Sequence, residues 1–356
     1  MTLLRGIDLG RIVSLAELEP FARERMAGPA FDYVAGGSWD EVTLAENVEA
    51  WRRLRFLPRV LTDVRHVDVG GAFLGRPAPL PVAFAPMAVQ GMAHPDGEVE
   101  AVRGAAAAGI PYCLSTSSSR TIEDVAAAAP DAERWFQLYL VDSLVYSRTL
   151  VERAAAAGYR AVVLTADLPV LGYRDRDRRS GFVLPPMPHV DAPVGARATR
   201  YGGLDTQAQL GLSWATAEAI RGWSDLPVVL KGILSPEDAR IAAESGFAGI
   251  CVSNHGARQL DRSIATADAL APIVEAVAGR CEVWVDGGIR RGLDVLAAFC
   301  LGATGVLVGR PYYWALAAAG AAGIGRATEI LRQELEIGLA ILGAHSLAEL
   351  DPSFLA

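Results

Sequence analysis

Short apolar runs alternate with alanine-rich amphipathic stretches along most of the chain, from about residue 81 onward. The runs are apolar at consecutive positions, which is typical of strands buried on both faces of a parallel sheet. The intervening stretches have apolar residues at helical spacing. The runs that we interpret as strands are 82–86, 111–115, 135–139, 161–166, 227–231, 248–253, 282–286 and 304–308. The intervening segments in which we expect helices include 96–108, 144–157, 236–246, 267–278 and 292–301.

Eight strand–helix repeats are the number that closes a barrel, so the pattern predicts an α/β protein with a (β/α)8, or TIM, barrel. The alternative is an open doubly wound sheet, which usually carries a glycine-rich phosphate-binding turn after its first strand. The first predicted strand lies in VAFAPMAVQ, which has no such turn, and neither G-x-G-x-x-G nor the Walker A motif occurs in the chain. The barrel is therefore the favoured fold.

Two segments lie outside the regular repeat. Residues 1–80 precede the first barrel strand, and we expect helices near 15–26 and 31–37. We interpret them as an N-terminal helical cap on the barrel, which would comprise residues 81–356, within a single structural domain. The segment 172–213 follows the fourth strand and is long and rich in Arg, Pro and Gly, which predicts a lid loop over the active site.

Composition and charge exclude several classes of protein. The 356-residue chain is 51% hydrophobic and 21% charged, so it can bury a large core and is not intrinsically disordered. The net charge of −8 argues against binding to nucleic acid or to an anionic membrane surface. The four cysteines have no C-x-x-C spacing, and we find neither a secretion signal nor an apolar run of membrane-spanning length. We therefore expect a soluble, cytoplasmic protein without a nucleic-acid or membrane partner.

The basic residues are almost all arginine. Of the 33 lysine and arginine residues, only Lys231 is a lysine. A coding bias that replaces lysine wherever arginine serves would leave a lysine where a compact point charge is needed, and chance would also leave one. Composition alone does not decide between these explanations.

Polar residues follow nearly every predicted strand. The reactive groups of a (β/α)8 barrel lie at the carboxyl ends of its strands, so these residues should meet at one rim. A lone glutamine or threonine at a strand end usually satisfies backbone groups, but convergence from nearly every strand predicts an active site. The residues at these ends are Ser115, Gln137, Tyr139, Thr165, Asp167, Lys231, Ser253, His255, Asp286, Gly288, Gly309 and Arg310.

The ends of the last two strands suggest a phosphate site. DGGIRRG (286–292) and GRP (309–311) offer backbone amides, a helix N-terminus and the guanidinium groups of Arg290 and Arg310. The alternative is a pair of glycine turns with solvated arginines.

The end of the sixth strand suggests acid–base chemistry. In SNHGARQLD (253–261), Arg258 would disfavour the cationic form of His255, which could then serve as a base while the arginine binds an anion. A carboxylate at Asp167 that faces His255 across the rim would stabilise the imidazolium and offset Arg258. Arg174 lies a few residues after Asp167, in GYRDRDRR, and could join this group. The alternative interpretation of this charged run is a solvated loop.

Several motifs together resemble the FMN-dependent 2-hydroxy-acid oxidase and dehydrogenase family, which includes glycolate, lactate and mandelate enzymes. The resemblance runs from about Phe31 to Ser346, and SNHG-x-RQLD with DGG-x-R-x-G is its most specific part. It implies a (β/α)8 barrel that binds FMN, acts on a small-molecule 2-hydroxy acid and often assembles as a tetramer. The motifs are FDYVAGG, FQLYL, LTADLPVLGYRDRDRR, LPVVLKGI, SNHGARQLD, DGGIRRG and GATGVLVGRP.

The resemblance also implies roles for individual residues. His255 would be the base that acts as the α-C–H bond of the substrate breaks, with Asp167 supporting it. Lys231 would lie beside flavin N1 and O2, where reduction places negative charge, and a point charge suits that position. The substrate carboxylate and hydroxyl would be bound by Arg174, Arg258, Tyr33 and Tyr139. The residues expected to bind FMN are Ala85, Ala88, Ser115, Gln137, Thr165, Lys231, Ser253, Asp286, Gly288, Arg290, Gly309 and Arg310, and no metal is implied.

Two positions bear on the substrate and the electron acceptor. Ser117 stands where glycolate enzymes carry a tryptophan, which predicts a roomier pocket and a substrate bulkier than glycolate, such as mandelate. Ala88 closes the APMA turn, where oxidases of the family tend to carry alanine and several dehydrogenases glycine, which favours O2 as the acceptor. No cytochrome-like extension precedes the barrel, and the lid lacks a membrane-binding insertion, which also favours a soluble oxidase.

Four alternatives to a 2-hydroxy-acid oxidase stay open at this point. A dehydrogenase would use an acceptor other than O2, and a tailoring oxidase would act on a peptide- or carrier-derived natural product. An FMN-barrel isomerase of a diphosphate is disfavoured because paired arginines beside His255 suit a carboxylate. A non-enzymatic binding protein is least favoured because it would not require His255, Asp167 and Tyr139 together.

Overall fold

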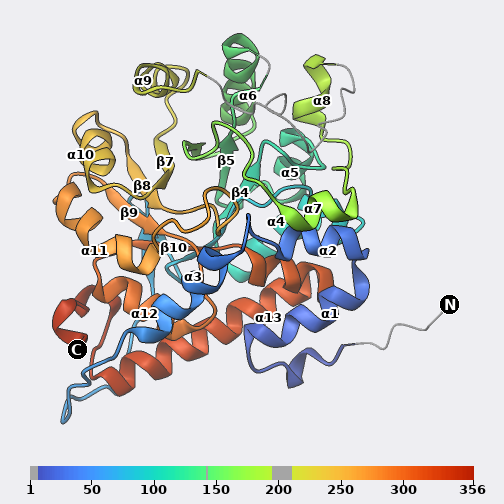
Figure 1. The fold of residues 1–356 in the computed structure, drawn as a ribbon. Helices are drawn as coiled ribbons and strands as arrows, with labels where there is room; N and C mark the ends of the chain where they lie inside the picture. Colours follow the sequence, from blue (N-terminus) through green and yellow to red (C-terminus); the bar gives the residue numbers. More distant parts are fainter. Residues whose placement is uncertain (1–6, 142, 195–210) are drawn as a thin grey trace.

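The computed structural model describes residues 7–141, 143–194 and 211–356. Its centre is a closed barrel of parallel strands in the order β10-β3-β4-β5-β6-β7-β8-β9, so the predicted (β/α)8 fold is confirmed (Figure 1). The barrel strands are β3 (Val82–Phe84), β4 (Tyr112–Ser115), β5 (Arg134–Leu138), β6 (Ala161–Thr165), β7 (Val228–Ile233), β8 (Gly249–Val252), β9 (Glu282–Val285) and β10 (Gly305–Val308).

Alternate residues of each strand point into the barrel, and their chemistry changes from one end to the other. The lower inward positions are apolar and include Trp135 and Trp284, whose rings stack with centroids 4.7 Å apart. At the carboxyl ends, the parallel register pairs Ser115 with Gln137 and Thr165 with Lys231. The register therefore gathers the polar groups at one mouth of the barrel.

A hairpin closes the opposite end of the barrel. It consists of β1 (Gly71–Phe73) and β2 (Arg76–Ala78), which pair antiparallel. Phe73 is 2% exposed and makes edge contacts with Trp135 and Trp284, at centroid distances of 5.2 and 5.4 Å. The sequence did not predict this hairpin, because its strands are too short to show a pattern.

Helices surround the barrel as the repeat predicts. The helices that the sequence predicted begin within about two residues of their predicted starts. Helices α5, α9 and α13 were not predicted. Helix α13 has non-helical backbone angles at Ala319 and Gly320, which kink it. The helices are α4 (Glu98–Ala108), α5 (Ile122–Ala128), α6 (Leu144–Ala156), α9 (Trp214–Arg221), α10 (Pro236–Glu244), α11 (Thr266–Val277), α12 (Gly292–Cys300) and α13 (Arg310–Leu342).

The N-terminal helices pack on the barrel helices rather than on each other alone. Helix α1 (Leu18–Arg25) packs on α13, α2 (Gly28–Ala35) on α7 (Asp175–Ser180), and α3 (Val42–Arg53) on α11 (Figure 1). Asp261, from the loop after β8, accepts hydrogen bonds from the Val42 and Thr43 amides at the start of α3. These contacts hold α2, which carries Tyr33, at the mouth of the barrel.

The segment after β6 differs from the single loop that the sequence predicted. It contains α7 (Asp175–Ser180) and α8 (Pro188–Val194), and residues 195–210 of the predicted lid lie outside the described residues. Helix α7 has Asp175 and Asp177 in its first turn and Arg178 and Arg179 in its last, an order that favours the helix dipole. No helix in the described part of the chain is both long and apolar enough to cross a membrane.

Candidate active site

A cavity of about 300 Å³ opens at the carboxyl ends of the barrel strands. All the residues that the sequence predicted for the site line it, except three. Those three are Asp167, Gln137 and Ser253, and each is hydrogen-bonded to a residue that does line the cavity. The site therefore forms as one cluster, with these three residues behind its wall.

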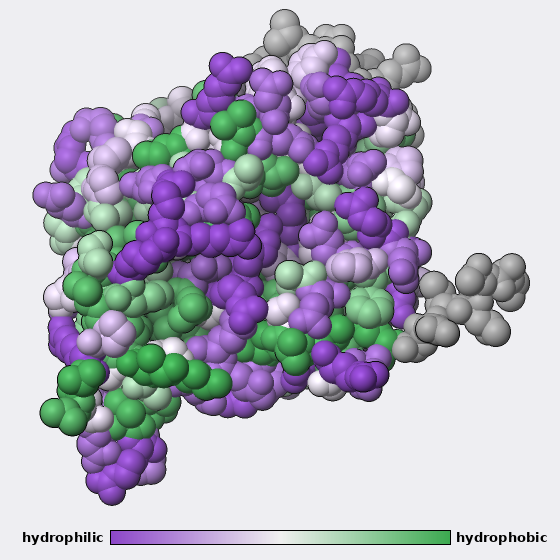
Figure 2. Space-filling view, turned by 60° about the horizontal axis from the view of Figure 1, so that its bottom comes forward, coloured by the Kyte–Doolittle hydropathy of each residue, from purple (hydrophilic) through white to green (hydrophobic). Residues whose placement is uncertain are grey.

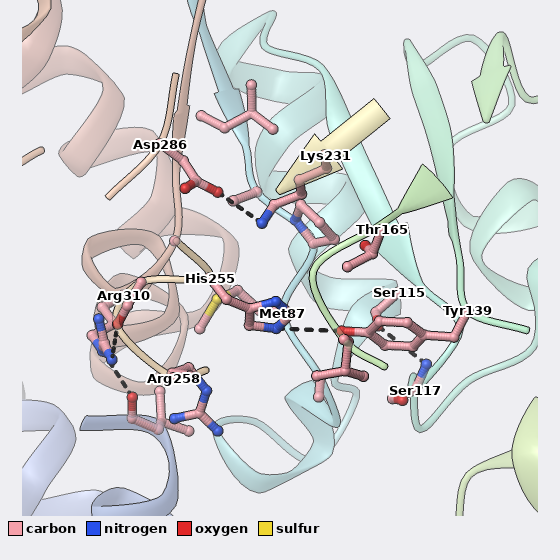
Figure 3. Close-up of a pocket in the computed structure, with 18 of the residues that line it drawn as sticks. Met87, Ser115, Ser117, Tyr139, Thr165, Lys231, His255, Arg258, Asp286 and Arg310 are labelled. Atoms are coloured by element: carbon pink, nitrogen blue, oxygen red, sulfur yellow. Dashed lines mark hydrogen bonds and ion pairs between the residues drawn. The ribbon is translucent and has the colours of Figure 1, made fainter. Parts of the chain in front are cut away.

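His255 lies between a phenol and a carboxylate. Its Nε2 atom is 3.3 Å from the Tyr139 hydroxyl (Figure 3). Its Nδ1 atom is 3.0 Å from Oδ1 of Asp167. Its backbone has a positive φ of 59°, and its amide donates a hydrogen bond to the Ser253 hydroxyl. A strained backbone at such a position is typical of a functional site, and here it turns the imidazole into the cavity.

The surroundings of His255 favour its neutral form. Burial lowers the pKa of the imidazole below its ordinary value, the positive charges of Lys231 and Arg174 lower it further, and Asp167 opposes them. The sequence attributed this effect to Arg258; the structure instead assigns it to burial and to these two cations. Burial would raise the pKa of Asp167, but His255 and Lys231 hold it below its ordinary value. A neutral imidazole oriented by a carboxylate can accept a proton.

Gln259 and Gly232 determine the position of Asp167, and neither residue was identified from the sequence. The Gln259 side-chain amide donates hydrogen bonds to the carbonyls of Asp167 and Val170, at 2.8 and 2.9 Å. Gly232 has a φ of +104°, and a Cβ atom there would lie 2.6 Å from Asp167. Only glycine therefore allows the β7 backbone to pass so close to the carboxylate. Both residues lie inside the motifs: Gln259 follows Arg258 in SNHGARQLD, and Gly232 follows Lys231 in LPVVLKGI.

The two predicted substrate-binding arginines share one aromatic ring. The guanidinium of Arg258 lies 4.7 Å and that of Arg174 5.8 Å from the centre of the Tyr33 ring. Arg258 also donates hydrogen bonds to the carbonyls of Tyr33 and Gly36. Both positive charges therefore lie near one aromatic ring, an arrangement suited to a carboxylate.

Lys231 forms a buried ion pair. Its ammonium lies 3.0 Å from Oδ2 of Asp286 (Figure 3). It also donates to the Ser253 hydroxyl at 2.9 Å. Burial disfavours the charge, but Asp286 and Asp167 raise the pKa of Lys231 above its ordinary value. The lone lysine therefore brings a permanent point charge into the cavity.

A short polar chain lines the wall between β4 and β6. The Ser115 hydroxyl donates to Oε1 of Gln137 at 2.9 Å, and Nε2 of Gln137 donates to the Thr165 hydroxyl at 3.0 Å. The Ser117 amide donates to the Ser115 hydroxyl. Ala85 and Ala88 line the cavity as well, and the Ala88 and Val89 carbonyls accept from the Tyr313 hydroxyl.

The loop after β9 is shaped by residues of the N-terminal segment. Gly288 has a φ of +84°, and a Cβ atom there would overlap the backbone carbonyl oxygen of Asn47 in α3. The Trp51 indole donates to the Gly287 carbonyl at 2.8 Å. Asn47 and Asn254 exchange two side-chain hydrogen bonds, of 2.8 and 2.7 Å. No signal in the sequence identifies Asn47 or Trp51, because their partners lie more than two hundred residues away.

The end of the cavity near this loop is positively charged. Burial lowers the pKa of Arg290, and burial with the charges of Arg258 and Arg290 lowers the pKa of Arg310. The Arg310 guanidinium donates to the carbonyls of Val34, Gly36 and Gly256, so its side chain ties α2 to the turn after β8. Partly buried guanidinium groups beside glycine amides are suited to binding an anion.

Fold and site together define a class of protein: a (β/α)8-barrel enzyme with a histidine–carboxylate pair, two neighbouring arginines and a cationic loop at one mouth. A family model described as FMN-dependent dehydrogenase matches residues 22–356, and the chain belongs to this family.

Named relatives support the assignment. The chain is 43% identical to an L-lactate oxidase of Nostoc sp., covering 96% of this chain and 98% of the relative. It is 45% identical to a 4-hydroxymandelate oxidase of Amycolatopsis orientalis, covering 94% and 96%. A crystal structure of mandelate oxidase with (S)-4-hydroxymandelic acid superposes with a TM-score of 0.90 at 44% identity, covering 97% and 98%. The resemblance seen in the sequence is confirmed, and the chain is an FMN-dependent oxidoreductase of the 2-hydroxy-acid oxidase type.

The described residues fit FMN. Oδ1 of Asp286 is buried and has no hydrogen-bond partner among them, so it can accept from a cofactor hydroxyl. The cationic end of the cavity suits the phosphate, and the polar chain at Gln137 suits the edge of a flavin ring. No group of three His, Cys, Asp or Glu residues in the described part could hold a metal ion.

Proposed function

We propose that the protein oxidises a 2-hydroxy acid bulkier than glycolate to the 2-oxo acid, with O2 as the acceptor and H2O2 as the second product. The mandelate type of substrate, with an aromatic ring, fits the cavity best. Relatives named for lactate, glycolate and 4-hydroxymandelate have similar identities of 43 to 45%, so overall similarity does not select the substrate.

The apolar wall of the cavity is the observation that favours a bulky aromatic substrate over glycolate. Besides the arginine pair, the cavity is lined by leucine, valine and methionine side chains, and by Ser117, where a bulky ring would narrow it. Apolar walls with a few polar groups at one end orient an amphipathic ligand. The wall residues are Leu140, Val141, Leu168, Leu171, Leu184, Met187 and Val190.

The polar residues of this chain would bind and orient the substrate. Arg258 and Arg174 would bind the carboxylate, with the Tyr33 hydroxyl beside them. Tyr139 would donate to the oxygen of the substrate hydroxyl as it becomes a ketone. Holding both ends of the hydroxy-acid group fixes the position of the α-hydrogen.

His255 would accept the proton. Its Nε2 atom faces the cavity beside Tyr139, and Nδ1 is turned to Asp167. The lowered pKa leaves Nε2 unprotonated near neutral pH, and Asp167 would stabilise the imidazolium that forms. The proton that His255 accepts is that of the substrate hydroxyl, and FMN, when bound, supplies the acceptor for the α-hydrogen and the two electrons.

The remaining predicted residues would hold FMN. Lys231 would stabilise negative charge on the flavin, and Asp286 would bind the ribityl chain. The residues that would contact the ring are Ala85, Ala88, Ser115, Gln137 and Thr165; those toward the ribityl chain and phosphate are Ser253, Gly288, Arg290, Gly309 and Arg310. Ala88 supports O2 as the acceptor.

The proposal is tested by anaerobic titration of the purified holoenzyme with glycolate, lactate and both enantiomers of mandelate. We expect one mandelate enantiomer to bleach the yellow flavin at the lowest concentration, and air to restore the colour with release of H2O2. Bleaching without recovery in air would indicate a dehydrogenase with another acceptor. A flavin that no 2-hydroxy acid bleaches would contradict the proposal.

Replacing Ser117 with tryptophan should reverse the substrate preference. The side chain would fill the space beside the apolar wall, so we expect the KM for mandelate to rise at least about tenfold and that for glycolate to change little. The measurement is steady-state H2O2 production with both acids, and Ser117→Ala, which leaves the space open, is the control. An unchanged mandelate KM in Ser117→Trp would show that Ser117 does not border the substrate.

Replacing Lys231 with methionine should weaken FMN binding and slow flavin reduction, each by about tenfold or more, because a buried charge next to the flavin is lost. Flavin fluorescence titration of the apoprotein and anaerobic stopped-flow spectroscopy measure the two effects. Lys231→Arg keeps the charge and tests whether the compact ammonium matters. Normal values for Lys231→Met in both measurements would make the single lysine an accident of composition.

We also propose that the protein acts in the cytoplasm as a homo-oligomer, a tetramer by family resemblance. Leu293, Ile337 and Ile341 of α12 and α13 are 48, 61 and 67% exposed, and Figure 2 shows hydrophobic surface on the side where these helices lie. Exposed apolar patches of this kind favour association. The cysteines of the described residues are free, which suits a reducing compartment. Light scattering of the holoenzyme gives the oligomeric state directly.

A further inference from the structure

His189 is a buried histidine in the segment after β6, and it is not one of the residues that would bind substrate or FMN. It belongs to α8, its side chain is 0% exposed, and its ring makes an edge contact with Phe136 at a centroid distance of 6.1 Å. It does not line the active-site cavity, but its neighbours Met187 and Val190 do.

Both nitrogen atoms of His189 have hydrogen-bond partners on the barrel. Nε2 accepts from the Ile122 amide at 3.1 Å, in the first turn of α5, and Nδ1 lies 3.2 Å from the Ser118 hydroxyl. That hydroxyl donates its own hydrogen to the Arg120 carbonyl at 2.6 Å, so it accepts from Nδ1–H. The neutral ring therefore satisfies every partner, and a protonated ring would face the Ile122 N–H with a second N–H.

The charge environment keeps the ring neutral. Burial, with a smaller contribution from Arg153, lowers the pKa of His189 to about 4, although Glu123 and Asp124 oppose this shift. The contact is thus fixed across the physiological pH range.

The turn that receives His189 is itself anchored to the barrel. Ser119 donates its amide and its hydroxyl to the buried carboxylate of Glu98, at 2.8 and 2.5 Å. Glu98 also accepts from the Gln90 amide at 2.9 Å, in the loop after β3. The turn 117–119 is therefore a rigid support, and His189 attaches the segment after β6 to it. Ser117, on the same turn, lines the cavity.

We propose that His189 is a positioning residue for substrate specificity. By binding the turn 117–119 and the start of α5, it holds Met187 and Val190 in place as the apolar wall that a bulky substrate side chain contacts. A small acid held by the arginine pair does not reach that wall. This inference rests on the proposed function, because it concerns the side chain of the 2-hydroxy acid.

The test compares the His189→Leu variant with the wild-type protein, both with FMN bound. It measures anaerobic stopped-flow flavin reduction by mandelate and by glycolate or lactate. We expect the dissociation constant for mandelate to rise about tenfold or more, with that for the small acid within about twofold. The limiting reduction rate with the small acid should also stay within about twofold. His189→Gln, whose amide can accept from Ile122 and donate to Ser118, should recover most of the mandelate affinity. His66→Leu makes the same change at an exposed histidine and should change neither constant.

Two results would overturn the inference: equal loss with both acids in His189→Leu, or no loss with either. A wild-type flavin that no 2-hydroxy acid reduces would instead contradict the proposed function. In that case, hydrogen exchange of the holoenzyme tests the contact of His189 with Ile122 and Ser118 independently of catalysis. The Ile122 amide and residues 183–191 should exchange about tenfold faster in His189→Leu than in the wild type, because their shared hydrogen bonds are lost. Equal exchange rates in the two proteins would reject the anchoring role of His189.

Discussion

The His255→Gln variant is expected to keep bound FMN and to lose flavin reduction by about 10²–10⁴-fold, the usual contribution of a general base. The structure gives the reason: Nε2 faces the cavity and Nδ1 is hydrogen-bonded to Asp167, and glutamine offers no group that accepts a proton near neutral pH. Apart from Ser253, the residues that would hold FMN lie on other strands, and His255→Gln keeps the backbone amide that bonds Ser253, so the visible spectrum should change little. Anaerobic stopped-flow reduction by the best 2-hydroxy acid measures the loss.

The pH dependence distinguishes a lost base from a distorted site. Because burial, Lys231 and Arg174 lower the pKa of His255, the wild-type reduction rate should stay high near neutrality and fall only below the ordinary histidine value of 6.5. This fall reflects protonation of Nε2, and it should be absent in His255→Gln. His345→Gln makes the same change at an exposed histidine and should retain the wild-type rate and profile. A His255→Gln rate within a few-fold of the wild type would exclude His255 as the base.

The sequence was informative about the site because its chemistry lies at the ends of strands. Once the barrel is predicted, the ends of the strands must meet, so Tyr139, Lys231 and His255 could be assigned to one rim without coordinates. The residues that orient this rim were not predictable in the same way. Gln259 acts through backbone carbonyls, and His189 through a backbone amide, and such contacts leave no pattern in the side chains of the partner segment.

The fold was predictable where burial imposes a pattern. The barrel strands are apolar at successive positions because both faces are covered, and their predicted positions agree with the structure. Helix α7, with the sequence DRDRRS, has no apolar periodicity, and its formation depends on packing against α2. The hairpin of β1 and β2 depends on one inserted ring, Phe73, rather than on an alternating pattern. Tertiary contacts, not local sequence, determine these elements.

The Gly288→Ala variant should lose FMN binding by about a hundredfold or more, because the loop that would hold the phosphate cannot keep its shape. The left-handed backbone alone costs a non-glycine residue about 1 kcal/mol. The added Cβ atom would also overlap the carbonyl oxygen of Asn47, which lies inside α3 and cannot retreat without breaking that helix. The loop would move instead, and with it the hydrogen bond from Trp51 to the Gly287 carbonyl.

Gly279→Ala separates these two costs. Gly279 also has a positive φ, of +72°, but nothing lies within 4 Å of a Cβ atom there, so only the backbone cost applies. We expect Gly279→Ala to lower the Tm of the apoprotein slightly and to bind FMN normally in a fluorescence titration. Gly288→Ala should lower the Tm more and bind FMN weakly at every concentration tested. Because the clash is with residue 47, equal FMN affinities in the two variants would mean that α3 does not set the shape of this loop, and that the motif DGG holds the cofactor without help from the N-terminal segment.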